Sequence, residues 1–115
     1  ISATFHTNLM KAAAEKLSKD RELVKFSPAT IPVVHNVNAR IQSEPESIKE
    51  LIIEQIFKPV LWVDCIETMA NNGVTNIVEC GAGKVLSGLC KRINSSIKAY
   101  STEDASSLSQ TLSSL

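Results

Sequence analysis

Apolar side chains recur every three or four residues in some stretches of the chain and form short unbroken runs in others. The first spacing predicts amphipathic helices, and the second predicts strands. The predicted helices cover residues 8–25, 43–57, 59–71, 84–93 and 102–115. The predicted strands cover residues 31–38, 75–80 and 97–101. Because strands and helices alternate in the second half, the pattern favours an α/β fold with at least partly parallel strand pairing.

Local signals refine these boundaries. Ser43 and Glu46 have the spacing of a capping box, and Pro45 suits the first turn of a helix. Pro59 is expected to end one helix and start the next, which stops at the sequence 71–73, Asn-Asn-Gly. The residues expected to face inward from that third helix are Val60, Leu61, Val63, Ile66 and Met69.

Three predicted strands are few for a parallel sheet, which usually has more strands and is covered on both faces. Several helices would compete to cover such a small sheet. The simplest interpretation is that the chain is part of a larger α/β domain whose other strands lie upstream.

Composition narrows the function classes. The chain has 115 residues, no net charge and 43% hydrophobic residues, which argues against a dedicated binder of nucleic acid or membrane surfaces. No apolar run approaches the roughly 20 residues of a membrane-spanning helix, and no signal peptide is visible. Cys65, Cys80 and Cys90 lie in apolar contexts and are expected to be buried free thiols in a reducing compartment. Neither His6 nor His35 has the neighbours that a metal site needs, so no metal is predicted.

The stretch "IVECGAGKVLSG", residues 77–88, resembles a strand, a glycine loop and a helix, the arrangement in which phosphates are often bound. A Walker loop would need Gly at position 78 and Ser or Thr at 85, and both are valine. The dinucleotide pattern would need Gly at 86, which is leucine. We therefore favour a structural turn at Gly81 and Gly83 over a phosphate site.

Four segments together resemble one enzyme family, the malonyl-CoA:acyl-carrier-protein transacylases. They are "TFHTNLM" at 4–10, "IPVVHNV" at 31–37, "EQIFKPVLW" at 54–62 and "VECGAGKVLSGLCKRI" at 78–93. They occur in the family's order and cover essentially the whole chain. Two positions depart from the family's usual residues: His35 stands for an asparagine, and Ala82 stands for the proline of a Gly-Pro-Gly turn.

The resemblance implies that residues 1–115 form one unit, the C-terminal part of a larger α/β-hydrolase-like acyltransferase domain. It implies transfer of malonyl from malonyl-CoA to acyl carrier protein through a serine ester, in fatty acid biosynthesis. The family's nucleophilic serine, its N-terminal glutamine loop and its carboxylate-binding arginine would lie upstream. Arg21, Arg40 and Arg92 match none of these positions. A monomeric cytoplasmic enzyme without cofactor is expected.

His6 matches the family's catalytic histidine. Histidine can take a proton from a serine hydroxyl and return it to a leaving thiolate, since its usual pKa lies near operating pH. Without the resemblance, a lone histidine is more often a capping or core residue. Gln55 matches the position whose backbone carbonyl orients that imidazole, although it could equally be an ordinary polar helix residue. If both assignments hold, Nδ1 of His6 should lie about 2.6–3.2 Å from the Gln55 carbonyl oxygen.

The role of three further residues is left open, and so are two alternative interpretations of the whole chain. Lys84, Lys91 and Arg92 are either a solvated helix face or a docking patch for an acidic acyl carrier protein. The chain could instead be a complete, non-enzymatic α/β binding module, which would have a closed core and no exposed sheet edge. It could also belong to an acyltransferase domain of a multienzyme polyketide or fatty-acid synthase.

Overall fold

The structure, a computed structural model, describes residues 5–115 and their side chains, with the exception of the Arg21 side chain. The chain divides into two compact units, Ile1–Cys65 and Ile66–Leu115, and the division falls inside a helix. That both units belong to one subdomain of a larger protein stays a prediction. None of the helices in the described part is long and apolar enough to cross a membrane.

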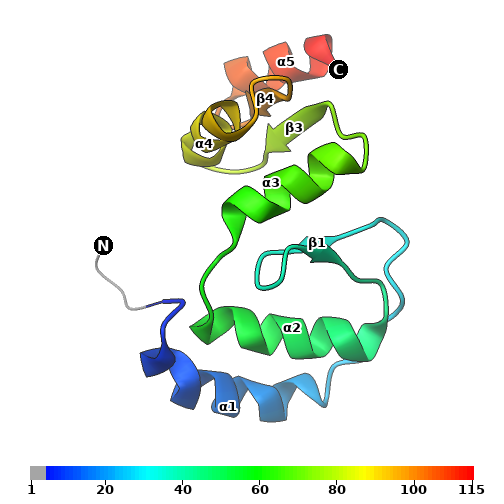
Figure 1. Ribbon diagram of the computed structural model, residues 1–115, viewed down its shortest axis with the longest axis vertical. Helices are drawn as coiled ribbons and strands as arrows, with labels where there is room; N and C mark the ends of the chain where they lie inside the picture. Colours follow the sequence, from blue (N-terminus) through cyan, green and yellow to red (C-terminus); the bar gives the residue numbers. More distant parts are fainter. Residues whose placement is uncertain (1–4) are drawn as a thin grey trace. The chain divides into compact units, whose positions relative to one another are not determined.

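The first unit contains two neighbouring helices and a small hairpin (Figure 1). Its elements are η1 (Asn8–Met10), α1 (Lys11–Arg21), β1 (Val34–His35), β2 (Arg40–Ile41) and α2 (Pro45–Phe57). The helices α1 and α2 lie side by side, and Ala14 of α1 is buried. A small side chain at this position lets the two helices approach closely.

Two predictions for this unit are corrected. The helix predicted over 8–25 ends at Arg21, because the amide of Leu23 bonds to the carbonyl of Asp20 and closes the last turn (3.1 Å). The strand predicted over 31–38 is a hairpin: β1 pairs antiparallel with β2 across residues 36–39. The Asn38 side chain accepts the Arg40 amide there (3.0 Å), a turn that the β-rich sequence conceals.

Helix α2 ends where predicted and has Pro45 in its first turn, but it begins two residues later than predicted. The N-cap is Glu44, and it makes no side-chain capping bond, so the capping box predicted at Ser43 is wrong. Instead, Oε1 of Gln42 accepts the amides of Ser43 (3.0 Å) and Glu44 (3.3 Å).

The third helix, α3 (Trp62–Asn71), begins three residues later than predicted. Residues 59–61 are not helical, and the Leu61 amide donates to the carbonyl of Asn36 (2.8 Å) outside any helix. Of the residues expected to face inward, Val60, Leu61 and Val63 are exposed, whereas Ile66 is completely buried.

The second unit contains a two-stranded parallel sheet with two helices against it (Figure 1). Its elements after α3 are β3 (Asn76–Glu79), α4 (Val85–Ile93), β4 (Lys98–Ser101) and α5 (Ala105–Ser114). The pairing runs from Asn76 opposite Lys98 to Glu79 opposite Ser101, so the parallel prediction is confirmed. The last helix begins three residues later than predicted, after an Asp104 N-cap whose carboxylate accepts the Ser107 amide (2.7 Å).

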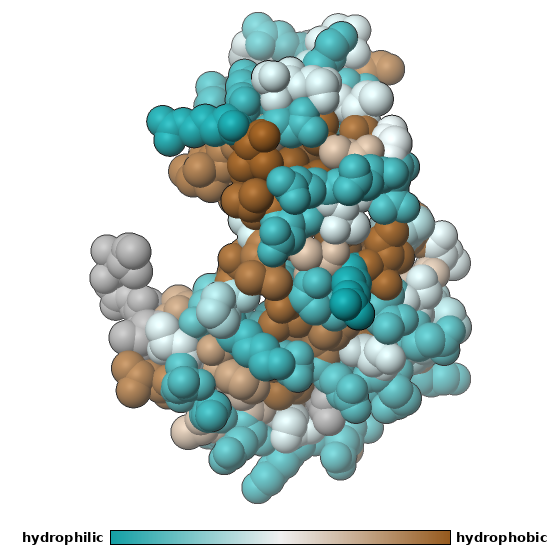
Figure 2. Space-filling view, in the orientation of Figure 1, coloured by the Kyte–Doolittle hydropathy of each residue, from teal (hydrophilic) through white to brown (hydrophobic). Residues whose placement is uncertain are grey.

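The core of the second unit is small, and much apolar surface stays exposed. Ile66, Cys90 and Ile97 are buried, but Leu86 of α4 is 41% exposed and Leu112 of α5 is 68% exposed. Figure 2 shows apolar side chains reaching the surface over α4.

The three cysteines are free thiols, as predicted, but only two of them are buried. Burial raises the pKa of the Cys65 and Cys90 thiols, which keeps them protonated. Cys80 is exposed, contrary to prediction, because it directly follows β3 at the start of the glycine turn.

Candidate active site

His6 lies in the turn before η1, in a conformation that few residues adopt. Its backbone φ is 61°, in the left-handed region, which costs a non-glycine residue about 1–2 kcal/mol. The His6 amide donates to the carbonyl of Ile56 in the last turn of α2 (3.0 Å), and this bond holds the turn against the helix end. Thr4, which opens the histidine motif, lies outside the described residues.

The imidazole of His6 makes a second bond to the same helix end. Its Nδ1 lies 2.6 Å from the carbonyl oxygen of Gln55, within the range expected from the sequence. Since a carbonyl oxygen can only accept, Nδ1 carries the proton in the neutral ring, and Nε2 is left as an acceptor. The residue as a whole is exposed. The catalytic role of His6 and the supporting role of Gln55 stay predictions.

Contacts between α1 and α2 support the same corner of the unit. The ammonium of Lys11, the first residue of α1, lies 5.9 Å from the ring centroid of Phe57, the last residue of α2. A groove of about 370 Å³ runs between the two helices, lined by Lys11, Ala14, Glu15, Ser18, Ile53 and Phe57. His6 does not line this groove. The groove and the Lys11–Phe57 contact are therefore part of the packing of α1 against α2 and do not extend the site around His6.

A carboxylate side chain of the protein itself lies at the glycine turn. The carboxylate of Glu79, at the end of β3, accepts the amides of Leu86 (3.2 Å) and Ser87 (2.8 Å) in the first turn of α4. The Ser87 hydroxyl lies 2.7 Å from the same carboxylate. These bonds hold the pKa of Glu79 below its ordinary value, chiefly through the Ser87 amide and hydroxyl. The amides that would hold a phosphate in a phosphate loop are therefore occupied by Glu79.

Sequence reasoning did not single out Glu79. The available signal was a carboxylate at a strand end followed by a glycine turn and a helix start, which places an acid near free amides. Gly81 and Gly83 have φ values of 130° and 87°, so this turn needs glycine at both positions, as the structural interpretation predicted.

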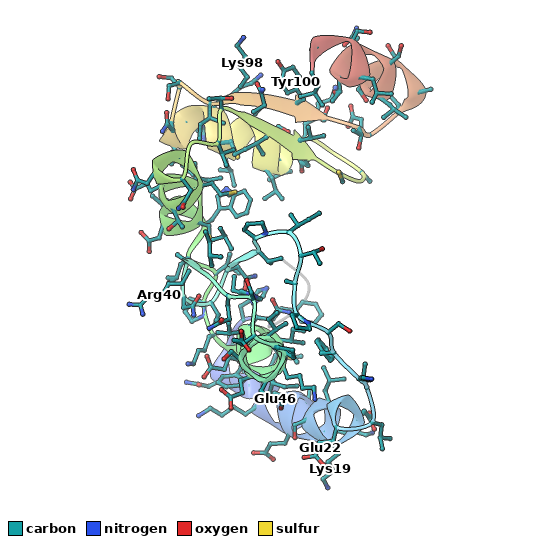
Figure 3. The ribbon with its side chains drawn as sticks, turned by 90° about the vertical axis from the view of Figure 1, so that its right-hand side faces the viewer. Lys19, Glu22, Arg40, Glu46, Lys98 and Tyr100 are labelled. Carbon is teal, nitrogen blue, oxygen red and sulfur yellow. The ribbon has the colours of Figure 1, made fainter. Side chains whose placement is uncertain are left out.

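The three basic residues of the predicted docking patch differ in their environments. Lys84 pairs with Glu103 (2.6 Å), and this hydrogen bond and charge raise the pKa of Lys84. Lys91 and Arg92 are exposed in the last turn of α4, where positive charge suits the helix dipole. Lys91 also lines a groove of about 430 Å³ together with Lys98 and Tyr100, whose side chains project from β4 in Figure 3.

The remaining histidine has a structural environment. His35 is half-buried in β1, and its carbonyl accepts from the Ala39 amide (2.8 Å) and lies 3.7 Å from Sγ of Cys65. Arg40, which matched no family position, projects from β2 and is exposed (Figure 3). No group of His, Cys, Asp or Glu within residues 5–115 could hold a metal ion.

The comparisons with known proteins agree on one kind of relative. The chain is 41% identical over 104 residues to the malonyl CoA-acyl carrier protein transacylase of Bacillus subtilis strain 168, a match that spans 90% of the chain and 33% of the relative. It is 36% identical over 112 residues to the transacylase of the same name from Escherichia coli K12, covering 97% of the chain and 36% of the relative. No protein-family model matches.

Solved structures give the same answer. The malonyl-CoA:acyl carrier protein transacylase of Xanthomonas oryzae pv. oryzae matches 99% of the chain with a TM-score of 0.93 and 38% identity. A malonyl-transacylase in complex with its type II PKS acyl-carrier protein matches all of the chain with a TM-score of 0.93 and 36% identity. The chain covers 36% and 37% of these two structures. It is thus homologous to a region that makes up about a third of such transacylases.

The Glu79 cap predicts a pH-dependent contribution to stability. Because folding lowers the pKa of Glu79, its contribution is present above the ordinary glutamate pKa and is lost as the pH falls through the lowered value. We expect Glu79→Gln to lower the Tm by a few degrees at neutral pH and to have little effect in strong acid. Thermal unfolding followed by circular dichroism across this pH range measures the difference.

Glu67→Gln, at an exposed carboxylate of α3, is the matched control. An equal Tm loss at every pH would contradict the charged cap.

Proposed function

We propose that this chain forms the C-terminal part of a malonyl-CoA:acyl-carrier-protein transacylase and that His6 is its general base and acid. The observation that carries the proposal is the 2.6 Å bond from Nδ1 of His6 to the Gln55 carbonyl, in a chain homologous to such transacylases. This bond leaves Nε2 of an exposed histidine as the proton acceptor.

The chemistry would run in two half-reactions that share one proton relay. A serine hydroxyl attacks the thioester carbonyl of malonyl-CoA while Nε2 takes the hydroxyl proton. The tetrahedral intermediate collapses to a malonyl-serine ester, and Nε2 returns the proton to the leaving thiolate of coenzyme A. In the second half, Nε2 takes the proton of the carrier thiol as its sulfur attacks the ester. The serine leaves with that proton, and the relay is restored.

A backbone carbonyl suits this relay. It orients the imidazole and selects its tautomer but places no full negative charge beside the ring. The aspartate of a Ser-His-Asp triad, in contrast, does place such a charge there. The identity of the Gln55 side chain should then matter little, because only its main-chain oxygen bonds to the ring.

The nucleophile would come from outside the 115 residues. The sequence contains no G-x-S-x-G, the elbow in which the family's serine resides. The chain spans about a third of the length of the relatives it matches, which leaves room for that serine elsewhere.

The exposed apolar surface favours a larger protein over the alternative of a small, complete binding module. A module would have a closed core, whereas Leu9 (77% exposed) and Leu112 (68% exposed) lie on helices at positions of apolar periodicity. Within the described residues, β3 and β4 form a parallel sheet of two strands only. Parallel sheets occur almost exclusively as larger, doubly covered structures.

The second substrate would be an acyl carrier protein. Lys91 and Arg92 form an exposed basic pair that could meet acidic carrier residues, and Lys84 adds a charge already shared with Glu103. A carrier of fatty acid biosynthesis is the first candidate. A polyketide carrier is the second, because one of the similar structures is a complex with a type II PKS acyl-carrier protein. A monomeric, cytoplasmic enzyme without cofactor stays a prediction from the family resemblance.

The first test removes the base. In the full-length protein, His6→Ala should lower kcat for malonyl transfer about 10²–10⁴-fold, the usual contribution of general acid–base catalysis. Gln55→Ala should change kcat little, since the carbonyl remains. Transfer of radiolabelled malonyl from malonyl-CoA to carrier protein measures both. A His6→Ala enzyme with a near wild-type rate would refute the assignment.

The second test uses the 115 residues alone. Incubated with malonyl-CoA and carrier protein, this chain should produce no malonyl-carrier above background, because it offers no matching nucleophile. Mass spectrometry of the carrier detects the product. Turnover by the isolated chain would contradict the proposal that the serine lies outside it.

The third test concerns docking. Lys91→Glu combined with Arg92→Glu should raise the KM for carrier protein about three- to tenfold and leave the KM for malonyl-CoA nearly unchanged. The effect should shrink at high ionic strength. Lys16→Glu combined with Lys19→Glu, an equal change of charge at two exposed residues of α1, is the control (Lys19 is labelled in Figure 3). Equal changes in both KM values would remove the docking role.

A further inference from the structure

The Gln55 carbonyl is available to His6 because of a nearby residue that bonds to neither of them. In an α-helix the amide of residue i donates to the carbonyl of residue i−4. The last such bond of α2 runs from Lys58 to Glu54 (2.9 Å). The next donor in the series would be residue 59, and its acceptor would be Gln55. Residue 59 is proline, which has no N–H.

Pro59 also stops the helix from continuing past this point. A residue before proline is biased away from the helical region, and Lys58 is extended, with φ −93° and ψ 152°. The chain then leads to Leu61, whose amide bonds to Asn36 on the hairpin loop (2.8 Å). The amide of residue 60, which would have served Ile56, is thereby carried out of the helix.

Both carbonyls released in this way are used by one residue. The Gln55 oxygen accepts from the His6 ring (2.6 Å), and the Ile56 oxygen accepts from the His6 amide (3.0 Å). The second bond holds the backbone of His6 in its left-handed conformation, and the first holds its ring.

The end of α3 provides an internal comparison. After α3 the chain turns through Gly73 (φ 84°), and the amides of Gly73 and Val74 return to the carbonyls of Ala70 (3.0 Å) and Met69 (3.1 Å). That glycine turn consumes the leftover carbonyls of its own helix. At α2 the following residues cannot do so, and a distant segment takes their place.

We propose that Pro59 is a positioning residue for His6: its missing N–H keeps the Gln55 carbonyl free, and this selects the imidazole tautomer with the proton on Nδ1. The catalytic consequence rests on the proposed function of His6, but the hydrogen-bond arrangement does not. The two can therefore fail separately.

The test compares two replacements of Pro59 in the full-length protein. Pro59→Ala supplies an N–H and lets Lys58 become helical, so the new amide at position 59 can compete with His6 for the Gln55 oxygen. Replacement of Pro59 by lactic acid, the ester analogue of alanine, relaxes the ring constraint equally but supplies no N–H. The two variants differ in the donor at position 59 and in the weaker acceptor strength of the ester carbonyl of residue 58. Pro45→Ala, in the first turn of the same helix, is the control that leaves the far end unchanged.

The primary readout is the tautomer of His6. Two-bond ¹⁵N–¹H spectra of ¹⁵N-histidine-labelled protein report which ring nitrogen carries the proton, and His6→Gln identifies the signal. We expect the Nδ1-protonated form in the wild type, in the lactic acid variant and in the Pro45→Ala control. In Pro59→Ala we expect a mixture with the Nε2-protonated form, together with a kcat about 3- to 30-fold lower and a little-changed KM.

Three outcomes decide the proposal. The proposal is overturned if Pro59→Ala keeps the wild-type tautomer. It is also overturned if the lactic acid variant shows a mixture of tautomers, and this outcome is informative even if Pro59→Ala does not fold. A mixed tautomer in Pro59→Ala with a wild-type one in the lactic acid variant supports it. If His6→Gln keeps full activity, the assignment of the base fails, while the tautomer data still decide the role of Pro59.

Discussion

Two main-chain carbonyls at the end of α2 determine the geometry of the first unit. A helix cannot satisfy its own last carbonyls, and a site that leaves them without partners is unfavourable when it is shielded from water. Here the carbonyls of Gln55 and Ile56 accept hydrogen bonds from the ring and the amide of His6, which lies 49 positions from Gln55 in the sequence. These two bonds give the last carbonyls of α2 hydrogen-bond partners and hold the backbone of His6 in its left-handed conformation. The bond to Gln55 also places the ring proton on Nδ1.

Other contacts of the unit keep that helix end in place. Lys11 over the Phe57 ring joins the start of α1, which follows His6, to the last residue of α2. On the other side, the Leu61–Asn36 bond directs the chain away from the helix after Pro59. The histidine turn, both helices and the hairpin thus meet at one helix terminus. A residue in an unfavourable backbone conformation persists only where its surroundings determine it in this way.

The sequence predicted most of the regular structure, because strong periodicity and clear stop signals coincide in the second half. The parallel pairing of 76–79 with 98–101 and the stop at Gly73 are examples. Short-range competition explains the errors: Asn38 turns a β-rich run into a hairpin, and Gln42 takes the amides assigned to a Ser43 cap. The distance between His6 and Gln55 was expected only through the family resemblance, since no local pattern relates residues 49 positions apart.

The end of α2 and the start of α4 both have main-chain groups that lack a partner within the helix, and these groups obtain their partners in opposite ways. At the start of α4, the free amides are taken by Glu79, which lies eight residues before Ser87 in the same strand–turn–helix segment. This local, charged partner occupies the donors that a phosphate or another anion would need, although glycine loops of this form often bind one. At the end of α2, proline removes the local donor, so the partner must come from elsewhere in the chain. A neutral carbonyl that binds a distant imidazole leaves the second ring nitrogen as a hydrogen-bond acceptor, whereas a carboxylate that binds the amides of its own helix start stabilises the fold.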